Sequence, residues 1–305
     1  MRTYAGPALI LVFCVSQAFR DVLFGHLFQN VGFFALVFRA FALSTILFVL
    51  LGWIFARGEL RSIGRHWRLV WWMNLTTALA WTCFFSGLRA IEPVVANAAH
   101  SGAGPIAALL ISLPWGGWVA GLQRLSRPMR ASYSGLIAAF ALLWLVVLGG
   151  WTGVDAGFAM SLVGLCALLV SGTSITASLL ISKRLHDLGF GSVSVTAVRY
   201  PALVLTAALL ATTSGQDVVG ASGDTIFVSL AGLVLIVGPT FVLQMGIART
   251  PALTGQIIRS LGPVFVFGLQ AFDSRIAWSG ATLAAILAYS VAAIACNVTH
   301  GWRAQ

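Results

Sequence analysis

Apolar runs of about 20 residues follow one another along almost the whole chain of 305 residues. A helix rises about 1.5 Å per residue, so such a run crosses the roughly 30 Å of hydrocarbon in a bilayer. With 59% hydrophobic and 9% charged residues, the chain has too little polar material to cover a water-soluble domain. We therefore expect an all-α integral membrane protein with ten transmembrane helices. The expected spans are residues 5–28, 31–55, 69–88, 92–116, 132–150, 157–182, 192–213, 224–246, 251–271 and 277–299.

A short pattern in the first half of the chain occurs again in the second half. Each copy has an alanine, a proline three residues later and a Gly-Pro pair further on. A separate pattern, Arg-x-x-Ala-Leu, begins at Arg39 and again at Arg199. Recurrence of two separate patterns indicates an internal repeat, which must be identified before the fold is interpreted. The first pattern comprises Ala90, Pro93, Gly104 and Pro105, and then Ala248, Pro251, Gly262 and Pro263.

The repeat divides the chain into two units, residues 1–150 and residues 151–305, with five expected spans each. Because five is an odd number, the second unit enters the membrane from the opposite face. We therefore expect two inverted five-helix repeats. Many secondary carriers are built in this way, and the two repeats allow the binding site to open to either side in turn.

Arginine and lysine lie mainly in gaps that would share one side of the membrane, which is typical of short cytoplasmic loops. The opposite side has only Arg89 and Arg275. The formal charge of +10 is thus a topology signal, and we expect no nucleic-acid partner. Both termini should lie on the cytoplasmic side of a bacterial inner membrane. The basic residues of the cytoplasmic gaps are Arg57, Arg61, Arg65, Arg68, Arg124, Arg127, Arg130, Lys183, Arg184 and Arg249.

The passage from Gly87 to Pro93, Gly-Leu-Arg-Ala-x-x-Pro, and its counterpart from Gly246 to Pro251 resemble the EamA-like branch of the drug/metabolite transporter superfamily. The arginines early in the second and seventh spans, Arg39 and Arg199, also resemble that family. The resemblance implies a carrier whose cavity is lined mainly by helices 1, 3, 4, 6, 8 and 9, with helices 5 and 10 at the periphery. It implies no single substrate, because relatives carry amino acids, vitamins, nucleotide sugars and drugs.

Five ionisable side chains fall inside the expected spans: Arg20, Asp21, Arg39, Arg199 and Arg259. Each costs a few kcal/mol to insert, so each is a candidate functional residue. Adjacent helical residues point in different directions, so we expect Asp21 to pair with an arginine of another helix, leaving at least one guanidinium free. Guanidinium binds carboxylate or phosphate through two parallel hydrogen bonds, which favours an organic anion or an amino-acid-like zwitterion as substrate. Alternatively, Arg39 and Arg199 reach the membrane interface.

Uncharged polar residues complete the predicted substrate-binding site. Three pairs lie three or four residues apart and therefore share a helix face. Because histidine titrates near neutral pH, His100 makes the proton a candidate coupling ion. The alternative is that these side chains only form hydrogen bonds between helices. The pairs are Gln17 with Asp21, Asn97 with His100 and Gln256 with Arg259, and the other candidates are Asn74, Trp81, Tyr200 and Gln244.

The expected function is secondary transport of a small polar metabolite across the membrane by alternating access, with export favoured. Alternatives are an uptake carrier for a vitamin or nucleotide-like metabolite, an intramembrane enzyme, or a non-transporting scaffold. The enzyme is disfavoured because the chain has no His-Glu-x-x-His or Gly-x-Ser-x-Gly motif, and a nucleotide-binding P-loop is also absent. We expect no metal or cofactor. The expected partners are a small-molecule substrate and the lipid bilayer, in a monomer or homodimer.

Overall fold

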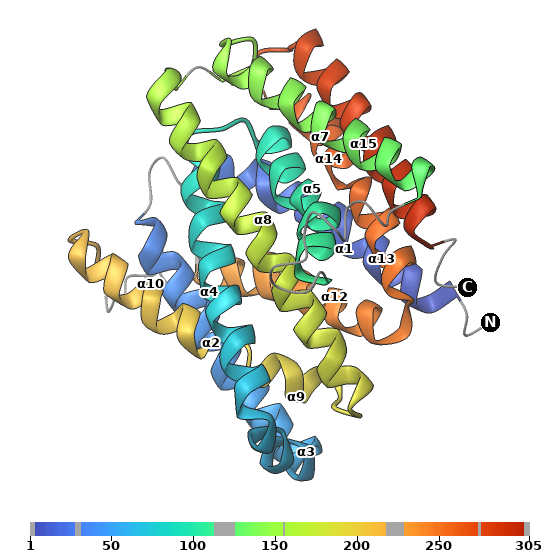
Figure 1. The fold of residues 1–305 in the computed structure, drawn as a ribbon. Helices are drawn as coiled ribbons and strands as arrows, with labels where there is room; N and C mark the ends of the chain where they lie inside the picture. Colours follow the sequence, from blue (N-terminus) through green and yellow to red (C-terminus); the bar gives the residue numbers. More distant parts are fainter. Residues whose placement is uncertain are drawn as a thin grey trace.

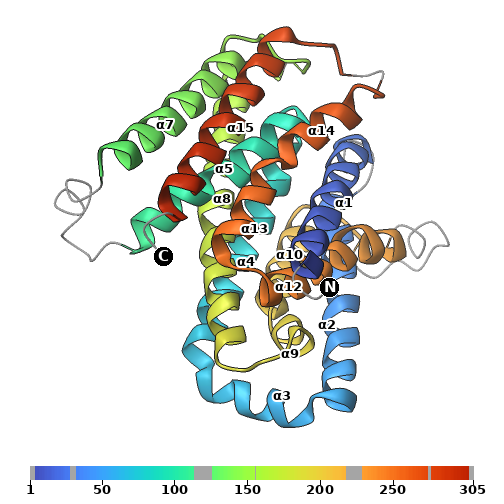
Figure 2. The same ribbon diagram turned by 90° about the vertical axis from the view of Figure 1, so that its right-hand side faces the viewer.

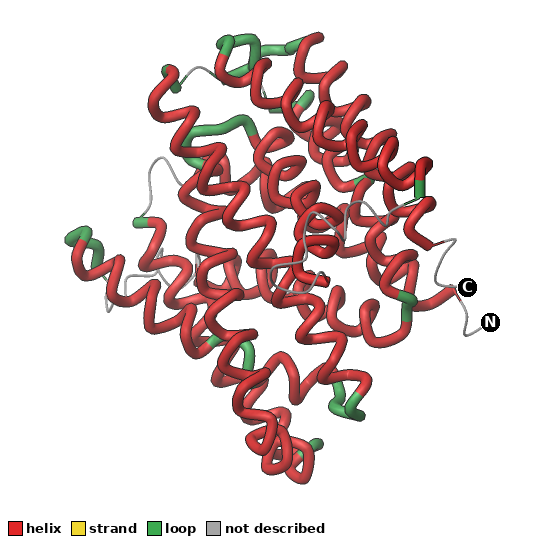
Figure 3. The backbone as a smooth tube through the Cα atoms, viewed as in Figure 1, coloured by secondary structure: helices red, strands yellow, loops and turns green. Residues whose placement is uncertain are grey.

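The computed structural model describes residues 4–27, 32–112, 126–154, 156–217, 229–273 and 276–301. All regular secondary structure in these residues is helical (Figure 3). Figure 1 shows the arrangement of the helices. They are α1 (Ala5–Leu27), α2 (Phe33–Phe55), α3 (Arg57–Ile63), α4 (Trp67–Leu88), α5 (Pro93–Ser112), α7 (Arg127–Leu148), α8 (Phe158–Asp187), α9 (Ser192–Ala197), α10 (Pro201–Thr213), α12 (Gly238–Arg249), α13 (Ala252–Ser260), α14 (Gly262–Gln270) and α15 (Gly280–Gly301).

Six helical segments of the described chain are long and apolar enough to cross a membrane. Large apolar side chains stand on their outer faces, and Phe55, Leu205 and Val234 are 77%, 72% and 66% exposed. Water-soluble proteins rarely expose large apolar patches. The architecture is therefore consistent with a multi-pass membrane protein. The six segments are Ala5–Leu23, Phe33–Phe55, Arg127–Leu148, Phe158–Asp187, Ser192–Thr213 and Ser229–Arg249.

Each expected span coincides with helical residues in the described part of the chain, but two spans are broken. The span at 192–213 divides into α9 and α10 just before Pro201. The span at 251–271 divides into α13 and α14 at Leu261, two residues before Pro263. Proline lacks a backbone N–H and crowds the preceding turn, so a helix is readily interrupted there.

The two copies of the Gly-Pro pattern differ in their backbone. Helix α5 continues without a break through Gly104 and Pro105, whereas the second copy separates α13 from α14. A further irregularity precedes α12, where a π-helical turn covers Leu233–Val237. Among the positions that set the predicted orientation, Arg124 and Arg275 lie outside the described residues.

Helices from the two halves of the chain pack against each other in matched pairs. Helix α4 lies along α8, and α1 lies along α12. Helix α5 also packs on α8, while α13 and α14 pack on α1. Helices α7 and α15 lie side by side at one edge of the molecule (Figure 2). Besides α7 and α15, the helices that join the two halves in these contacts are α1, α4, α5, α8, α12, α13 and α14.

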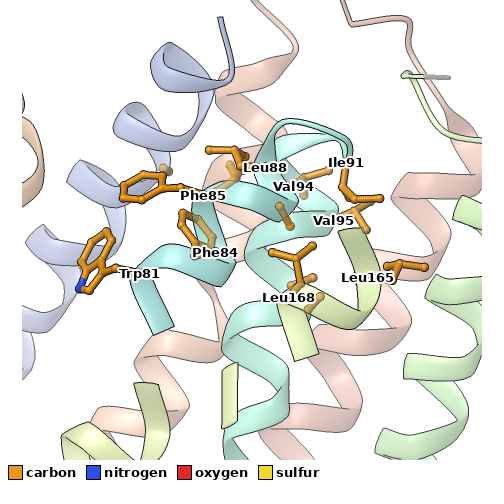
Figure 4. Close-up of a cluster of buried hydrophobic side chains, with 14 of the residues drawn as sticks. Trp81, Phe84, Phe85, Leu88, Ile91, Val94, Val95, Leu165 and Leu168 are labelled. Atoms are coloured by element: carbon orange, nitrogen blue, oxygen red, sulfur yellow. The ribbon is translucent and has the colours of Figure 1, made fainter. Parts of the chain in front are cut away.

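A cluster of aromatic and aliphatic side chains fills the space between α4, α5 and α8. Small residues let the backbones approach closely, because a Cβ atom on Gly87 would lie only 2.6 Å from Cγ of Leu168. A Cβ atom on Gly164 would lie 2.8 Å from Cγ1 of Ile91. Such close approach holds helices together in lipid, where apolar burial alone favours no helix contact over lipid. The labelled members in Figure 4 are Trp81, Phe84, Phe85, Leu88, Ile91, Val94, Val95, Leu165 and Leu168.

One buried carboxylate joins several segments at one end of the bundle. Glu92 lies in the turn between α4 and α5 and is 1% exposed. Its Oε2 atom accepts hydrogen bonds from the N–H of Gly153 at 3.0 Å and from Oγ1 of Thr282 at 3.2 Å. Its Oε1 atom accepts a hydrogen bond from Nε2 of Gln270. These partners belong to the linker before α8, to α15 and to α14, so we call this group the Glu92 junction.

Burial raises the pKa of Glu92, and the hydrogen bonds from Gly153, Gln270 and Thr282 oppose that shift without cancelling it. The folded chain therefore binds this proton more tightly than the unfolded chain does. The stabilising contribution is complete below the ordinary pKa of a glutamate and is lost as the pH rises through the raised pKa.

Replacing Glu92 with glutamine should remove this pH dependence. Between about pH 4 and pH 8 in detergent, the melting temperature of the natural protein should fall relative to that of Glu92→Gln. The control is Glu59→Gln, the same substitution at another glutamate that accepts hydrogen bonds. Glu59 accepts one from the N–H of Gly191 and one from Oγ of Ser194, both at 2.7 Å. Parallel melting curves for the natural protein and Glu92→Gln across this range would contradict the expectation.

Candidate functional site

Residues from both halves of the chain line a narrow cavity, whose atom-free space is about 360 Å³ when the open solvent at its mouth is included. Helices α1, α4, α5, α8, α12 and α13 each contribute at least one side chain, and Arg199 enters from the break between α9 and α10. Among the described residues, α7 and α15 contribute none to its lining. We call this space the central cavity. It is lined by Phe13, Gln17, Arg20, Trp81, Phe84, His100, Ile175, Arg199, Thr240, Leu243 and Arg259.

Arg20 and Asp21 form an ion pair with each other. The Nε and Nη2 atoms of Arg20 donate to Oδ1 of Asp21 at 2.9 Å and 2.5 Å. The expectation that Asp21 pairs with an arginine of another helix is therefore wrong. Although the two Cβ atoms diverge, the long arginine side chain reaches back to the neighbouring carboxylate.

A second helix completes the environment of this pair. From α5, Nδ2 of Asn97 donates to Oδ2 of Asp21 at 2.8 Å, so both carboxylate oxygens have donors. The guanidinium of Arg20 lies 5.0 Å from the ring centre of Trp81 and 5.4 Å from that of Phe84. Aromatic faces attract a cation, which adds to the stabilisation by the carboxylate. The charge of Arg20 is thus balanced inside the protein.

Among the described residues, Arg199 and Arg259 form fewer hydrogen bonds than Arg20 does and have no counter-ion. Arg199 is fully buried, and Nη2 donates to Oγ of Ser178 at 3.0 Å, but Nε and Nη1 have no hydrogen-bond partner. Arg259 is 6% exposed, and its Nη1 has no partner either. Neither guanidinium forms an ion pair with an acid that the structure describes. Two cations without counter-ions therefore face one cavity.

Asn74 supports the break that places Arg199 in the cavity. Its Nδ2 donates to the carbonyl of Val198 at 2.6 Å, and its Oδ1 accepts from the N–H of Ala202 at 3.1 Å. The side chain thus pairs with backbone groups on both sides of the break, as a helix interruption within a membrane protein requires. Asn74, which we expected to line the cavity, instead positions Arg199.

His100 is held by a chain of hydrogen bonds. Its Nδ1 lies 2.8 Å from Oγ of Ser171, which itself donates to the carbonyl of Ala80 at 2.6 Å. Because Ser171 uses its only proton on Ala80, the proton of the His100 bond must come from Nδ1. In the neutral ring, Nε2 is then left as an acceptor.

Three other predicted residues, Arg39, Tyr200 and Gln244, are not part of the lining of the central cavity. The Nη2 atom of Arg39, on α2, donates a hydrogen bond to the carbonyl of Asp217 at 2.6 Å. Tyr200 packs against Phe41 with ring centres 4.8 Å apart and ring planes tilted by 56°. Oε1 of Gln244 lies 3.2 Å from Nε2 of His186. The side chain of Gln256 lies outside the described residues.

Sequence reasoning missed the polar face of α8. Ser171, Ser174, Ser178 and Ser182 are spaced three or four residues apart and are all buried. Ser171 holds His100, and Ser178 holds Arg199 as well as Thr77 at 2.7 Å. The helical spacing is present in the sequence, but serine is common in membrane helices, so the spacing alone did not predict a site. Thr240, which lines the cavity beyond the π-helical turn, gave no such signal.

A second cavity, with about 430 Å³ of atom-free space including open solvent, adjoins the first, and Leu243 and Arg259 line both. Lys183 lies on its wall, near the C-terminal end of α8. We call it the Lys183 cavity. Its lining residues are Ile10, Leu179, Leu180, Lys183, Leu243, Ile247, Thr250, Pro251, Gly255 and Arg259.

The described residues contain no group of three or more His, Cys, Asp or Glu side chains that could hold a metal ion.

No family model matches the sequence. No curated protein matches it either. Eight chains of solved structures are similar to it. One is a crystal structure described only as that of a protein, with 18% identity and a TM-score of 0.64 over 100% of this chain and 98% of that one. At this identity the likeness concerns the fold alone.

Replacing Arg259 with glutamine should stabilise the protein in the absence of ligand. An uncompensated cation in a buried site is costly, so removing it should raise the free energy of unfolding by about 1–3 kcal/mol, measured as a higher melting temperature in detergent. Arg20→Gln is the matched control, because it strands the buried carboxylate of Asp21 and should lower stability by about 3–5 kcal/mol. Equal losses in both variants would mean that Arg259 has a counter-ion after all.

Proposed function

We propose that this protein is a secondary transporter of the EamA-like branch of the drug/metabolite transporter superfamily, which moves a small anionic metabolite by alternating access. The observation that carries the proposal is the pair of buried guanidiniums, Arg199 and Arg259, which face one cavity without counter-ions among the described residues. Ionisable groups at such depth in a membrane protein usually serve a substrate or ion pathway. An anionic substrate supplies the charge that these arginines lack.

The packing of the helices supports an inverted repeat of residues 1–150 and 151–305. A two-fold axis between the halves would exchange α1 with α8 and α4 with α12. The contacts follow that exchange, because α4 packs on α8 as α12 packs on α1. The contact of α5 with α8 corresponds in the same way to that of α13 and α14 with α1. Helices α7 and α15 correspond to each other and pack together.

The two cavities supply the elements of an alternating-access cycle. Helix α8 has 30 residues and is therefore about 45 Å long. The Glu92 junction lies near its N-terminal end, at Gly153, and the Lys183 cavity lies near its C-terminal end. In this proposal the substrate enters past Arg259 from the Lys183 side, which is cytoplasmic in a bacterial inner membrane, while the Glu92 junction closes the opposite side. Release there corresponds to export.

Transport should depend on Arg199 and Arg259. Purified protein in liposomes on a solid-supported membrane should give saturable transient currents with at least one class among carboxylates, phosphate esters and amino acids. Arg199→Gln and Arg259→Gln should each lower the apparent affinity about 10- to 100-fold, the effect of losing a charged hydrogen bond of roughly 1.5–3 kcal/mol. Arg39→Gln, outside the cavity, should retain the signal. Absence of current with every class, or an unchanged response in Arg259→Gln, would contradict transport by this site.

A further inference from the structure

The charges around the central cavity restrict the substrate more narrowly than the sequence does. Three arginines line it, and the acid nearest to them, Asp21, is not part of its lining. Asp21 is completely buried, with Oδ1 held by Arg20 and Oδ2 held by Asn97. No oxygen of this carboxylate is left without a donor. Among the residues that the structure describes, the cavity lining therefore has no free acid for an ammonium group.

Three other acids have partners away from the cavity. Glu92 belongs to the junction at one end of the bundle, and Glu59 binds Gly191 and Ser194. Asp187 pairs with Lys183 at 3.0 Å on the surface. An amino acid placed in the cavity would leave its ammonium group beside Arg199 and Arg259, where positive charge is already in excess. Like charges at this depth repel strongly because water does not screen them.

The two unmatched guanidiniums also set the preferred charge of the ligand. Arg199 and Arg259 both line the central cavity. A monoanion would balance one of them and leave the other buried without a counter-ion. A dianion would balance both, through oxygen atoms that reach Nε and Nη1 of Arg199 and Nη1 of Arg259.

The rest of the lining favours an apolar or aromatic body. Phe13, Trp81, Phe84, Ile175 and Leu243 form the uncharged wall. Cavities that bind small molecules are generally of this kind, mostly apolar with a few polar groups that fix the orientation. The Nε1 atom of Trp81 has no hydrogen-bond partner and is one more donor for a ligand oxygen.

We infer that the central cavity takes an organic dianion with an apolar body and no ammonium group, and not an amino-acid zwitterion. This inference rests on the proposed function, because it names the substrate class of the same site. A dicarboxylate and a phosphate monoester satisfy it equally, since both present two negative charges to Arg199 and Arg259.

The test keeps the aromatic body of the probe constant and varies its charge. Phenylsuccinate and phenyl phosphate are dianions at pH 7.5, 3-phenylpropanoate is a monoanion, phenylalanine is a zwitterion and phenethylamine is a cation. Dissociation constants for the full chain in detergent should be lowest for a dianion, about 10-fold higher for the monoanion, and higher again for the zwitterion and the cation. Comparison of the two dianions distinguishes carboxylate from phosphate chemistry.

Arginine variants test whether the preference for a dianion over a monoanion arises in the central cavity. Arg199→Gln and Arg259→Gln should each reduce the ratio of monoanion to dianion dissociation constants from about 10 to near 1. Arg39→Gln makes the same substitution outside the central cavity, so the ratio of monoanion to dianion dissociation constants should stay as in the natural protein. Size-exclusion chromatography and the melting temperature of each variant verify folding, and a ratio measured within one variant does not depend on its stability.

The outcomes separate this inference from the proposed function. Phenylalanine binding as tightly as the dianions would overturn the inference and leave an amino-acid carrier. No binding of either dianion at millimolar concentration would overturn it as well. Dianions that bind as expected but are not carried into liposomes would support the inference and refute transport.

Discussion

The structure depends on how the positive charges of three buried arginines, Arg20, Arg199 and Arg259, are balanced. A buried guanidinium needs an anion, a set of acceptors or an aromatic face, because otherwise the desolvation cost is not offset. Arg20 has all that it needs from Asp21, Trp81 and Phe84. Arg199 has one hydrogen bond, to Ser178, and the ring of Tyr200 at 5.9 Å, but neither Arg199 nor Arg259 has a counter-ion among the described residues. Stability is thus lowered at the place where an anionic ligand would restore it.

The helices around Arg199 and Arg259 hold these cations in place. Their side chains form hydrogen bonds with the backbone groups that the helix break would otherwise leave unpaired. Asn74 bridges the break between α9 and α10, so the helix is interrupted at Arg199 without leaving Val198 and Ala202 unpaired. Serines along α8 fix both His100 and Arg199 from the opposite wall. At the end of the bundle, Glu92 collects donors from three other segments. Rigid surroundings of this kind allow unbalanced charge to persist.

The helical architecture could be predicted because it depends on local properties. Long apolar runs form helices in lipid whatever their neighbours are, since no other backbone partners exist there. Prolines indicated irregular positions, although Gly104-Pro105 left α5 continuous while Pro263 follows a break. The site was harder to predict. Gln17, Arg20, Trp81, His100, Arg199 and Arg259 do meet in one cavity, whereas Arg39, Asn74 and Gln244 bind elsewhere. Their role in binding stays a prediction.

The helices, the approximate positions of their ends and the excess of positive charge inside the expected spans could be read from the sequence, because each follows from composition and spacing along the chain. Only the tertiary structure decided which charges are balanced. The bond from Asn97 to Asp21 joins α5 to α1, and that from Ser178 to Arg199 joins α8 to a helix break. Such contacts depend on how each helix is rotated against its neighbours, and that rotation is set by the packing of all the helices together.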